Sequence, residues 1–286
     1  MPDKICLVVT GATAAGKTDY AIELAEKYNT QIISADSRQC YKELNIGVAK
    51  PTQRQLQKIP HHFIDSHSIH EDVNVKVFEQ YALKAVNEIF KSNDVAVMVG
   101  GTGLYIKAFC EGLDDIPAVD EIIHKEIDDA YQLQGIVWLQ DELKTNDPSY
   151  FASGEVANPR RMMRALEVKL FTGKSILEFQ SGKKVPRNFK IKAINLEIPR
   201  EELYKRINNR VDGMMNAGLL KEAETLYAYR SLNALQTVGY KELFEFIEEK
   251  ISLEKAIDEI KKNTRHFAKR QLTWFKKYGN KLGKIN

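Results

Sequence analysis

The chain has 286 residues, of which 43% are hydrophobic, and a formal net charge of +3 at pH 7. This length and apolar content suit one large globular domain, or a core with a smaller second domain, and exclude a disordered chain as the default. The sequence contains no apolar run long enough to span a bilayer, and its first apolar segment lacks the flanks of a signal peptide. We therefore expect a cytoplasmic protein that makes no contact with a membrane.

The three cysteines, Cys6, Cys40 and Cys110, are odd in number and far apart. They predict neither a disulfide framework nor a zinc cluster. Because the net charge is small, we expect any anionic partner to bind local clusters of positive charge rather than a global field.

A phosphate-binding loop is predicted close to the start of the chain. The β-branched run of residues 5–9 indicates a strand, the spacing G-x-x-x-x-G-K-T follows it, and residues 20–25 have a helical pattern. Glycines let successive N–H groups face an anion at the helix N-terminus, while Lys17 adds a charge and the Thr18 hydroxyl can hold Mg²⁺. The alternative, a turn that only starts a helix, gives no reason for Lys17 beside Thr18. The predicted loop consists of Gly11, Ala12, Thr13, Ala14, Ala15, Gly16, Lys17 and Thr18.

A second short strand is predicted at residues 31–36, and it ends in Asp36. Ligands of open α/β sheets bind at the carboxyl ends of the strands, so Asp36 should lie close to the phosphate-binding loop. The alternative role for Asp36 is to cap the next turn, which is common for aspartate.

The region from Tyr41 to residue 105 contains a predicted loop, two strands and a helix. The loop covers residues 41–51, the strands residues 59–65 and 95–99, and the helix residues 77–90. The second of these strands ends in Gly100-Gly101-Thr102, where most NTP-hydrolysing machines have an aspartate that orders Mg²⁺. Its absence argues for a phosphate-loop enzyme that transfers another group.

Four histidines, His61, His62, His67 and His70, lie close together in the sequence and raise the question of a metal site. They lack a helical i, i+4 pair, and no cysteine or paired carboxylate joins them at ligand spacing. We therefore do not predict a metal site there.

A helical segment without apolar β-runs follows residue 114. It covers residues 122–144, breaks at Asp147-Pro148 and resumes at residues 160–171, before a β-pattern returns at residues 189–198. We predict an α/β fold in which a P-loop NTPase-like parallel sheet, flanked by helices, is formed by residues 1–114 and 190–286. Residues 115–189 are predicted to be an inserted, all-helical subdomain.

Two clusters of basic residues are candidates for binding a polyanion. One is on the insert at Arg160, Arg161 and Arg164, and the other, interleaved with aromatic residues, follows Glu259. Such clusters are often solvated helix faces, but a basic insert also suits a nucleic-acid backbone.

Together these motifs resemble the tRNA dimethylallyltransferase family, also called tRNA isopentenyltransferases, in order over nearly the whole chain. The matching stretches are residues 11–18, 34–41, 47–51, 60–65, 100–105, 160–167, 206–212, 238–240 and 264–274.

The resemblance implies transfer of a dimethylallyl group from dimethylallyl diphosphate to N6 of the adenosine 3′ of the anticodon. Asp36 would be the general base, Thr102 would border the reacting carbon, and Arg210 would hold the leaving diphosphate. Arg206, on the same helix face, is a weaker candidate for the role of Arg210. Thr18 would bind Mg²⁺.

The resemblance also implies contacts to the anticodon stem-loop of tRNA, whose target base is swung out of its stack. The contact residues would be Asp36, Ser37, Arg38, Gln39, Arg160, Arg161, Met162, Met163, Arg164, Gln236, Thr237, Val238, Gly239, Tyr240 and Lys241. His124 stands where family members can carry an arginine. We expect a monomer.

Two alternatives remain from the sequence. A small-molecule kinase would share the phosphate-binding loop and an inserted lid, and would use ATP. A non-catalytic RNA-binding module would keep the loop as a relic, and substituting Asp36 would leave its function intact.

Overall fold

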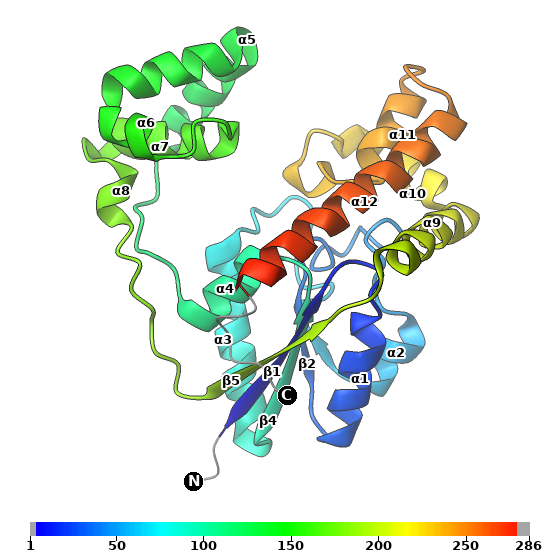
Figure 1. Ribbon diagram of the computed structural model, residues 1–286. Helices are drawn as coiled ribbons and strands as arrows, with labels where there is room; N and C mark the ends of the chain where they lie inside the picture. The colour runs from blue at the N-terminus through cyan, green and yellow to red at the C-terminus, as the bar shows by residue number, and fades with distance from the viewer. Residues whose placement is uncertain (1–3, 279–286) are drawn as a thin grey trace. The chain divides into compact units, whose positions relative to one another are not determined.

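The computed structural model describes residues 4–278, and its centre is a sheet of five parallel strands in the order β3-β2-β4-β1-β5 (Figure 1). The strands are β1 Ile5–Gly11, β2 Ile32–Ala35, β3 His61–His62, β4 Val95–Gly100 and β5 Lys190–Leu196. The predicted α/β fold with a parallel sheet flanked by helices is confirmed.

The two faces of the sheet are covered by different helices, because alternate residues of each strand point to opposite faces. On one face, Val9, Ile32 and Val97 pack with residues of α1 (Lys17–Lys27). On the other face, Val8 and Met98 belong to the cluster that includes residues of α3 (Val75–Ser92) and α4 (Gly103–Glu111). The short helix α2 (Gln53–Lys58) precedes β3.

The strand order brings together the three segments that follow β1, β2 and β4, at the edge of the sheet where these strands have their carboxyl ends. β4 lies between β1 and β2, so the segments that follow these three strands are neighbours at their carboxyl ends. The Thr102 N–H donates to the Ala35 carbonyl at 3.2 Å, which joins the segments after β4 and β2. Gly100 is needed at this contact, since a Cβ there would lie 2.2 Å from the Ala35 oxygen. This edge is where a ligand would bind.

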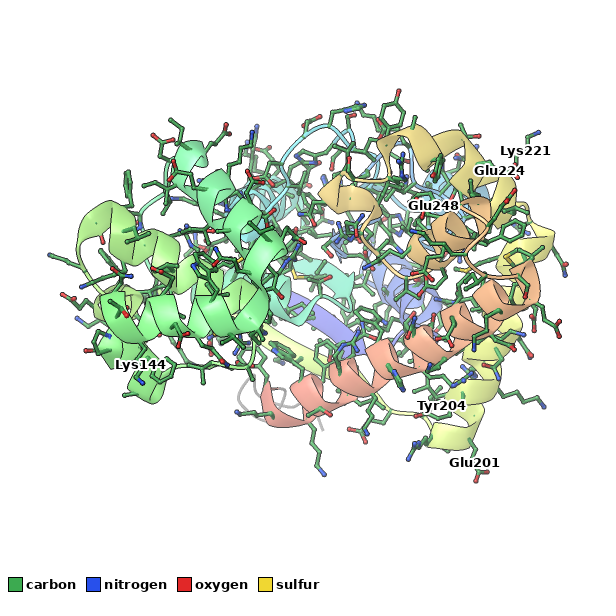
Figure 2. The ribbon with its side chains drawn as sticks, turned by 90° about the horizontal axis from the view of Figure 1, so that it is seen from above. Lys144, Glu201, Tyr204, Lys221, Glu224 and Glu248 are labelled. Carbon is green, nitrogen blue, oxygen red and sulfur yellow. The ribbon has the colours of Figure 1, made fainter. Side chains whose placement is uncertain are left out.

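Helices of the C-terminal segment cover this edge. They are α9 (Arg200–Asn216), α10 (Leu219–Leu226), α11 (Tyr240–Ile247) and α12 (Leu253–Tyr278), with the 3₁₀ turns η1 (Tyr227–Tyr229) and η2 (Asn233–Leu235). α12 contacts α9, α11, α4 and β1. At its contact with α9, the Arg265 guanidinium lies 6.0 Å from the centre of the Tyr204 ring, which is labelled in Figure 2.

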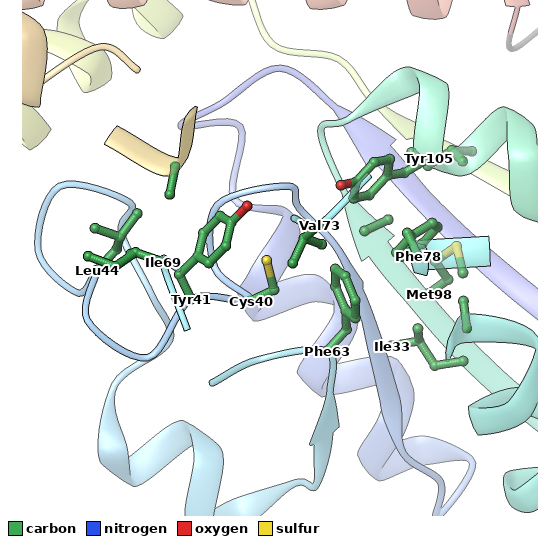
Figure 3. Packing of buried hydrophobic residues seen from close by; sticks show 14 of the residues in the cluster. Ile33, Cys40, Tyr41, Leu44, Phe63, Ile69, Val73, Phe78, Met98 and Tyr105 are labelled. Atoms are coloured by element: carbon green, nitrogen blue, oxygen red, sulfur yellow. The ribbon is translucent and has the colours of Figure 1, made fainter. Parts of the chain in front are cut away.

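Aromatic side chains fill the core between β2, β4 and α3, as Figure 3 shows. Phe78 and Tyr105 stack with their ring centres 4.3 Å apart, and Phe63 meets Phe78 edge-on at 5.1 Å. The strand predicted at residues 59–65 is only two residues long. The left-handed φ of 63° at Phe63 and 51° at Asp65 ends the extension, and buries the Phe63 ring instead.

The chain divides into two compact units. Of the described residues, 4–112 and 186–278 form the core unit, and Leu113–Val185 form the insert unit, where the sequence led us to expect residues 115–189. The insert unit contains α5 (Glu121–Asn146), α6 (Pro148–Ser153), α7 (Pro159–Thr172) and α8 (Ile176–Phe179), packed around Leu139, Leu143 and Leu166. α5 is kinked at Gly135, whose φ is 76°.

The two ends of the core unit that flank the insert are joined by Arg187. Its guanidinium donates to the Phe109 and Ala108 carbonyls, each at 2.8 Å, and forms an ion pair of 2.6 Å with Glu79. Within the insert unit, the Asp114 carboxylate accepts the N–H and the hydroxyl of Ser181, each at 2.9 Å.

In residues 4–278, no helix is long and apolar enough to cross a bilayer.

Candidate active site

A cavity of about 880 Å³ lies in the core unit where the chain leaves β1, β2 and β4. It is lined by residues 13–19 of the phosphate-binding loop and α1, by residues 36–39 after β2, and by residues 100–102 after β4. Val48 and Ala49, Arg210 of α9, residues 236–239 and one side of α12 also line it. The predicted diphosphate site and the predicted catalytic residues therefore share one cavity.

The phosphate-binding loop has a positive φ at both of its glycines and at one alanine. Gly16 has a φ of 88° and Ala14 a φ of 63°, so the chain curls before α1 begins. Gly11 is required by a close approach, because a Cβ there would lie 2.8 Å from the Leu196 carbonyl oxygen. The N–H groups in the first turn of α1 have no acceptor within the helix, and with the helix dipole they favour an anion.

Lys17 is held inside this loop. Its ammonium group donates to the Ala12 carbonyl at 2.7 Å. Burial lowers the pKa of Lys17 to about 8, the Asp36 carboxylate opposes this shift, and Arg210 adds to it. A bound diphosphate would place negative charge beside the Lys17 ammonium, which would favour its protonated form and raise its pKa again.

Gln271 of α12 joins the phosphate-binding loop to the segment after β4. Its side-chain oxygen accepts the Thr13 N–H at 2.8 Å, and its amide group donates to the Gly101 carbonyl at 2.9 Å. Gln271 is buried, and a Cβ on Gly101 would lie 2.2 Å from its Nε2 atom. Sequence reasoning did not identify Gln271 as a site residue.

Asp36 lies at the end of β2 and lines the cavity. Its Oδ1 atom accepts the N–H groups of Arg38 at 2.9 Å and Gln39 at 3.3 Å. Asp36 therefore caps the following turn, which was the alternative role, and this cap also fixes the direction of its carboxylate in the cavity.

Thr102 is the N-cap residue of α4 and, like Asp36, lines the cavity. Its hydroxyl oxygen accepts the Ser37 N–H at 3.1 Å and lies 3.4 Å from the Ser37 hydroxyl oxygen. The hydroxyl hydrogen is the only donor of this side chain, so it can turn either to Ser37 or to a ligand in the cavity.

Arg206 and Arg210 of α9 reach different parts of the loop. Arg210 donates to the Thr13 hydroxyl at 3.3 Å and lines the cavity. Arg206 forms an ion pair with Glu202, and its guanidinium lies 3.9 Å from the position of a Cβ on Gly16. Arg210 is thus the better placed of the two for an anion in the cavity.

The two core segments expected to contact tRNA meet near the cavity. Arg38 donates to the Asn233 carbonyl at 2.9 Å, which joins the turn after β2 to the segment that leads to α11. Gln236 and Lys241 are exposed, whereas the Tyr240 side chain is fully buried and its hydroxyl donates to Glu222. The exposed residues are the ones that can present side chains to a nucleic acid.

The expected tRNA-contact residues of the insert lie on α7. Arg160 and Arg161 are exposed, and Arg161 forms an ion pair with Glu155. The Met162 side chain is fully buried in the core of the insert unit, so it cannot face a ligand. Arg164 donates to the Pro117 carbonyl at 2.8 Å, so part of its role is to hold the insert unit together.

His124 contacts the same helix. Its Nδ1 atom lies 2.7 Å from a carboxylate oxygen of Glu167, a buried residue of α7. This contact within the insert unit gives His124 a structural partner.

Lys50 and Glu222 hold the loop after the Asp36 turn, and sequence reasoning did not identify a role for either. The Lys50 ammonium group donates to the Tyr41 carbonyl at 2.6 Å and pairs with Asp65. Lys50 thus binds a carbonyl at the start of its own loop, and Glu222 accepts N–H groups of residues 45–47, which no local sequence pattern reveals.

Among residues 4–278, no group of three or more histidine, cysteine or acidic side chains is arranged to hold a metal ion. A magnesium ion bound with a phosphate compound needs only one or two protein oxygens, since phosphate and water supply the others. Thr18 and Asp36 both line the cavity and provide oxygens of that kind.

Comparison with known proteins was consistent over nearly the whole chain. The model of the IPP transferase family matches residues 39–278. The tRNA dimethylallyltransferase of Christiangramia forsetii is 51% identical over 269 residues, which cover 94% of this chain and 89% of that protein. The enzyme of the same description from Flavobacterium johnsoniae is 46% identical over 283 residues, covering 97% and 92%.

Solved structures agree with these relatives. A eukaryotic dimethylallyltransferase acting on tRNA superposes with a TM-score of 0.79 at 29% identity, covering 95% of this chain and 70% of that one. The tRNA isopentenylpyrophosphate transferase of Bacillus halodurans gives a TM-score of 0.67 at 37% identity, covering 96% and 87%. These matches do not favour the small-molecule kinase that the phosphate-binding loop alone allows.

Proposed function

The chain belongs to the IPP transferase family, and from this premise we propose that it prenylates tRNA. The donor is dimethylallyl diphosphate, and the acceptor is N6 of the adenosine 3′-adjacent to the anticodon. The products are N6-(dimethylallyl)adenosine in tRNA and free diphosphate. Because the acceptor is tRNA, we expect the reaction in the cytoplasm, and we expect the enzyme to act as a monomer.

One observation carries the proposal. Residues 13–18 of the phosphate-binding loop and the Asp36 carboxylate line the same cavity, and Thr102 follows the strand after which most ATP-hydrolysing enzymes have a metal-ordering aspartate. This arrangement suits a reaction in which diphosphate leaves and a proton must be removed from the attacking group.

Diphosphate is proposed to bind at the curled loop of residues 11–18. Its oxygens would accept hydrogen bonds from three sources. These are the N–H groups in the first turn of α1, the Lys17 ammonium and the Arg210 guanidinium. Because these donors are already in place, they stabilise negative charge as it grows on the leaving group without a large reorganisation.

In the proposed step, the N6 amine attacks C1 of the dimethylallyl group, and an N–C bond forms as the C–O bond to diphosphate breaks. The electron pair of that bond leaves with diphosphate, and the amine proton passes to the Asp36 carboxylate. An exocyclic amine is a weak nucleophile, so a positioned base lowers the barrier. Thr102 borders the reacting carbon and can donate its hydroxyl hydrogen to diphosphate.

Mg²⁺ is proposed to bind with the donor through the Thr18 hydroxyl, and water and diphosphate oxygens would complete its coordination. When bound, it would neutralise part of the negative charge of diphosphate. Lys17 and Arg210 would hold the remaining charge.

The acceptor base must leave its stack in the anticodon loop to reach the cavity. We propose that Arg38 and the exposed Gln236 and Lys241 contact tRNA beside the cavity, and that the exposed arginines of α7 bind the phosphate backbone.

The test combines activity with binding. Purified protein, Mg²⁺, labelled dimethylallyl diphosphate and an anticodon stem-loop are incubated without ATP, and nucleosides are analysed by mass spectrometry. We expect N6-(dimethylallyl)adenosine from the unaltered chain, and at least about a hundredfold loss in Asp36→Asn with retained binding of the stem-loop. The exposed Asp129→Asn of the insert is the control. A normal rate in Asp36→Asn would remove Asp36 as the base, and a requirement for ATP would contradict the proposed reaction.

A further inference from the structure

Glu222 of α10 accepts four hydrogen bonds from two segments outside its own helix. Its Oε2 atom receives the N–H groups of Asn45 at 3.2 Å and Ile46 at 2.9 Å. Its Oε1 atom receives the Gly47 N–H at 3.0 Å and the Tyr240 hydroxyl at 2.7 Å. Three consecutive N–H groups that face one carboxylate form an anion-binding nest, so this loop conformation depends on the negative charge.

Tyr240 adds a steric constraint to this arrangement. Its ring is fully buried, and a Cβ on Gly47 would lie 2.6 Å from the ring atom Cζ. Burial and the neighbouring Glu222 carboxylate raise the pKa of Tyr240, so its hydroxyl stays protonated and remains a donor. The loop at residues 45–47 is therefore held from two sides.

The same loop continues into the wall of the cavity. Val48 and Ala49 line it, and their carbonyls accept the side-chain amide of Gln39 at 3.2 and 3.1 Å. The backbone N–H of Gln39 donates to the Asp36 carboxylate. Hydrogen bonds and the backbone of residues 45–49 thus link Glu222 through Gln39 to Asp36.

We propose that Glu222 is a positioning residue for the prenyl-transfer reaction. It is not among the residues that line the cavity, so it acts through others: it fixes the loop at residues 45–49, and through Gln39 the turn that directs the Asp36 carboxylate. The inference rests on the proposed function. A carboxylate displaced by about 1 Å loses much of its catalytic effect, on the order of a hundredfold, which is why a residue outside the cavity matters.

Glu222→Gln tests the inference with little change in volume. The substitution removes the charge and turns one acceptor into an amide that faces N–H donors. Hydrogen exchange is measured at residues 45–47, and kcat is measured with dimethylallyl diphosphate and an anticodon stem-loop. We expect exchange there to be faster by about tenfold or more, and kcat to fall by roughly 10 to 100-fold, with the KM for the stem-loop within about threefold.

The matched control is Glu224→Gln. Glu224 is an exposed residue of the same helix and is labelled at the outer side of α10 in Figure 2. Its substitution should change neither the exchange at residues 45–47 nor kcat. The melting temperature of each variant is recorded, because a residue that only stabilises the fold would lower it without changing the kcat of the folded enzyme.

A double substitution tests the route through Gln39. If Glu222 and Gln39 act through one loop, the losses of kcat in Glu222→Gln and Gln39→Ala will not multiply in the double variant. Losses that multiply, unchanged exchange at residues 45–47, or an unchanged kcat in Glu222→Gln would each overturn the inference. If the unaltered chain transfers no dimethylallyl group, the proposed function fails, and the exchange measurement still decides whether Glu222 holds the loop.

Discussion

Lys17 is a residue whose charge depends on what the cavity holds. Its ammonium group donates to the Ala12 carbonyl, and burial lowers its pKa to about 8. The unfolded chain keeps a lysine pKa near 10.5, so between these values the unfolded state binds more protons. This residue therefore makes the free energy of unfolding increase with pH in that range.

Binding of the donor has the opposite pH dependence: it weakens as the pH rises. In the proposed mechanism the charged form of Lys17 binds diphosphate, and that form is lost as the pH rises through about 8. We predict that the KM for dimethylallyl diphosphate increases by about tenfold for each pH unit above that value, while kcat at saturating donor stays level, because bound diphosphate raises the lysine pKa. Steady-state kinetics between about pH 7 and 10 will measure both.

Lys17→Arg is the matched variant, since a guanidinium stays charged across this range. Its KM for the donor should not change with pH, whatever the absolute value of that KM. A level KM in the unaltered enzyme would show that Lys17 is not the group that binds the diphosphate.

At the level of elements, α12 connects the two sides of the cavity through Gln271, which bonds the Thr13 N–H and the Gly101 carbonyl. Gln271→Ala leaves these two backbone groups without their partner, so we predict a loss of about 1–3 kcal/mol in the free energy of unfolding. We also predict a donor KM that is higher by about tenfold, because the loop is no longer fixed. Urea denaturation and donor kinetics check the two values.

Gly101→Ala gives an independent check on the same connection. Its methyl group would lie 2.2 Å from Gln271 Nε2, so it should displace that amide and raise the donor KM as Gln271→Ala does. Together the two substitutions should have little more effect than either one. A Gly101→Ala enzyme with normal donor KM would mean that the hydrogen bonds of Gln271 do not fix the loop.

At the scale of the whole molecule, the core unit carries the cavity and the insert unit carries a separate basic surface on α7. We predict that Arg160→Ala combined with Arg161→Ala weakens binding of tRNA and leaves the donor KM unchanged. The slope of log K against log salt should become shallower by about 0.7–0.9 for each phosphate group that the variant no longer binds. Fluorescence anisotropy with labelled tRNA at several salt concentrations measures this.

Lys144→Ala is the control, an exposed lysine of the same unit on α5. If α7 binds phosphate groups specifically, this variant should keep the original slope. Equal changes in both variants would indicate only a general effect of positive charge.

The sequence predicts well those parts that depend on local pattern. Continuous apolar runs locate β1, β2 and β4, and the loop spacing locates the residues around Lys17. It predicts poorly what tertiary contacts decide. β3 is shortened because Phe63 turns into the aromatic core, and Gln271 and Glu222 bond backbone groups that are far away in the sequence. Met162 was expected to contact tRNA, but it is buried. Its burial follows from packing within the insert unit, which the local sequence does not reveal.

Arg187 has a consequence for how this architecture can change over time. It fastens residue 187 to the carbonyls of residues 108 and 109, so both points where the core unit is interrupted are anchored to each other whatever lies between them. An insert attached at two adjacent, fixed points can be lengthened, shortened or replaced without rethreading the parallel sheet. If the insert unit binds tRNA as we propose, its RNA-binding surface can diversify while the residues that line the cavity of the core unit stay unchanged.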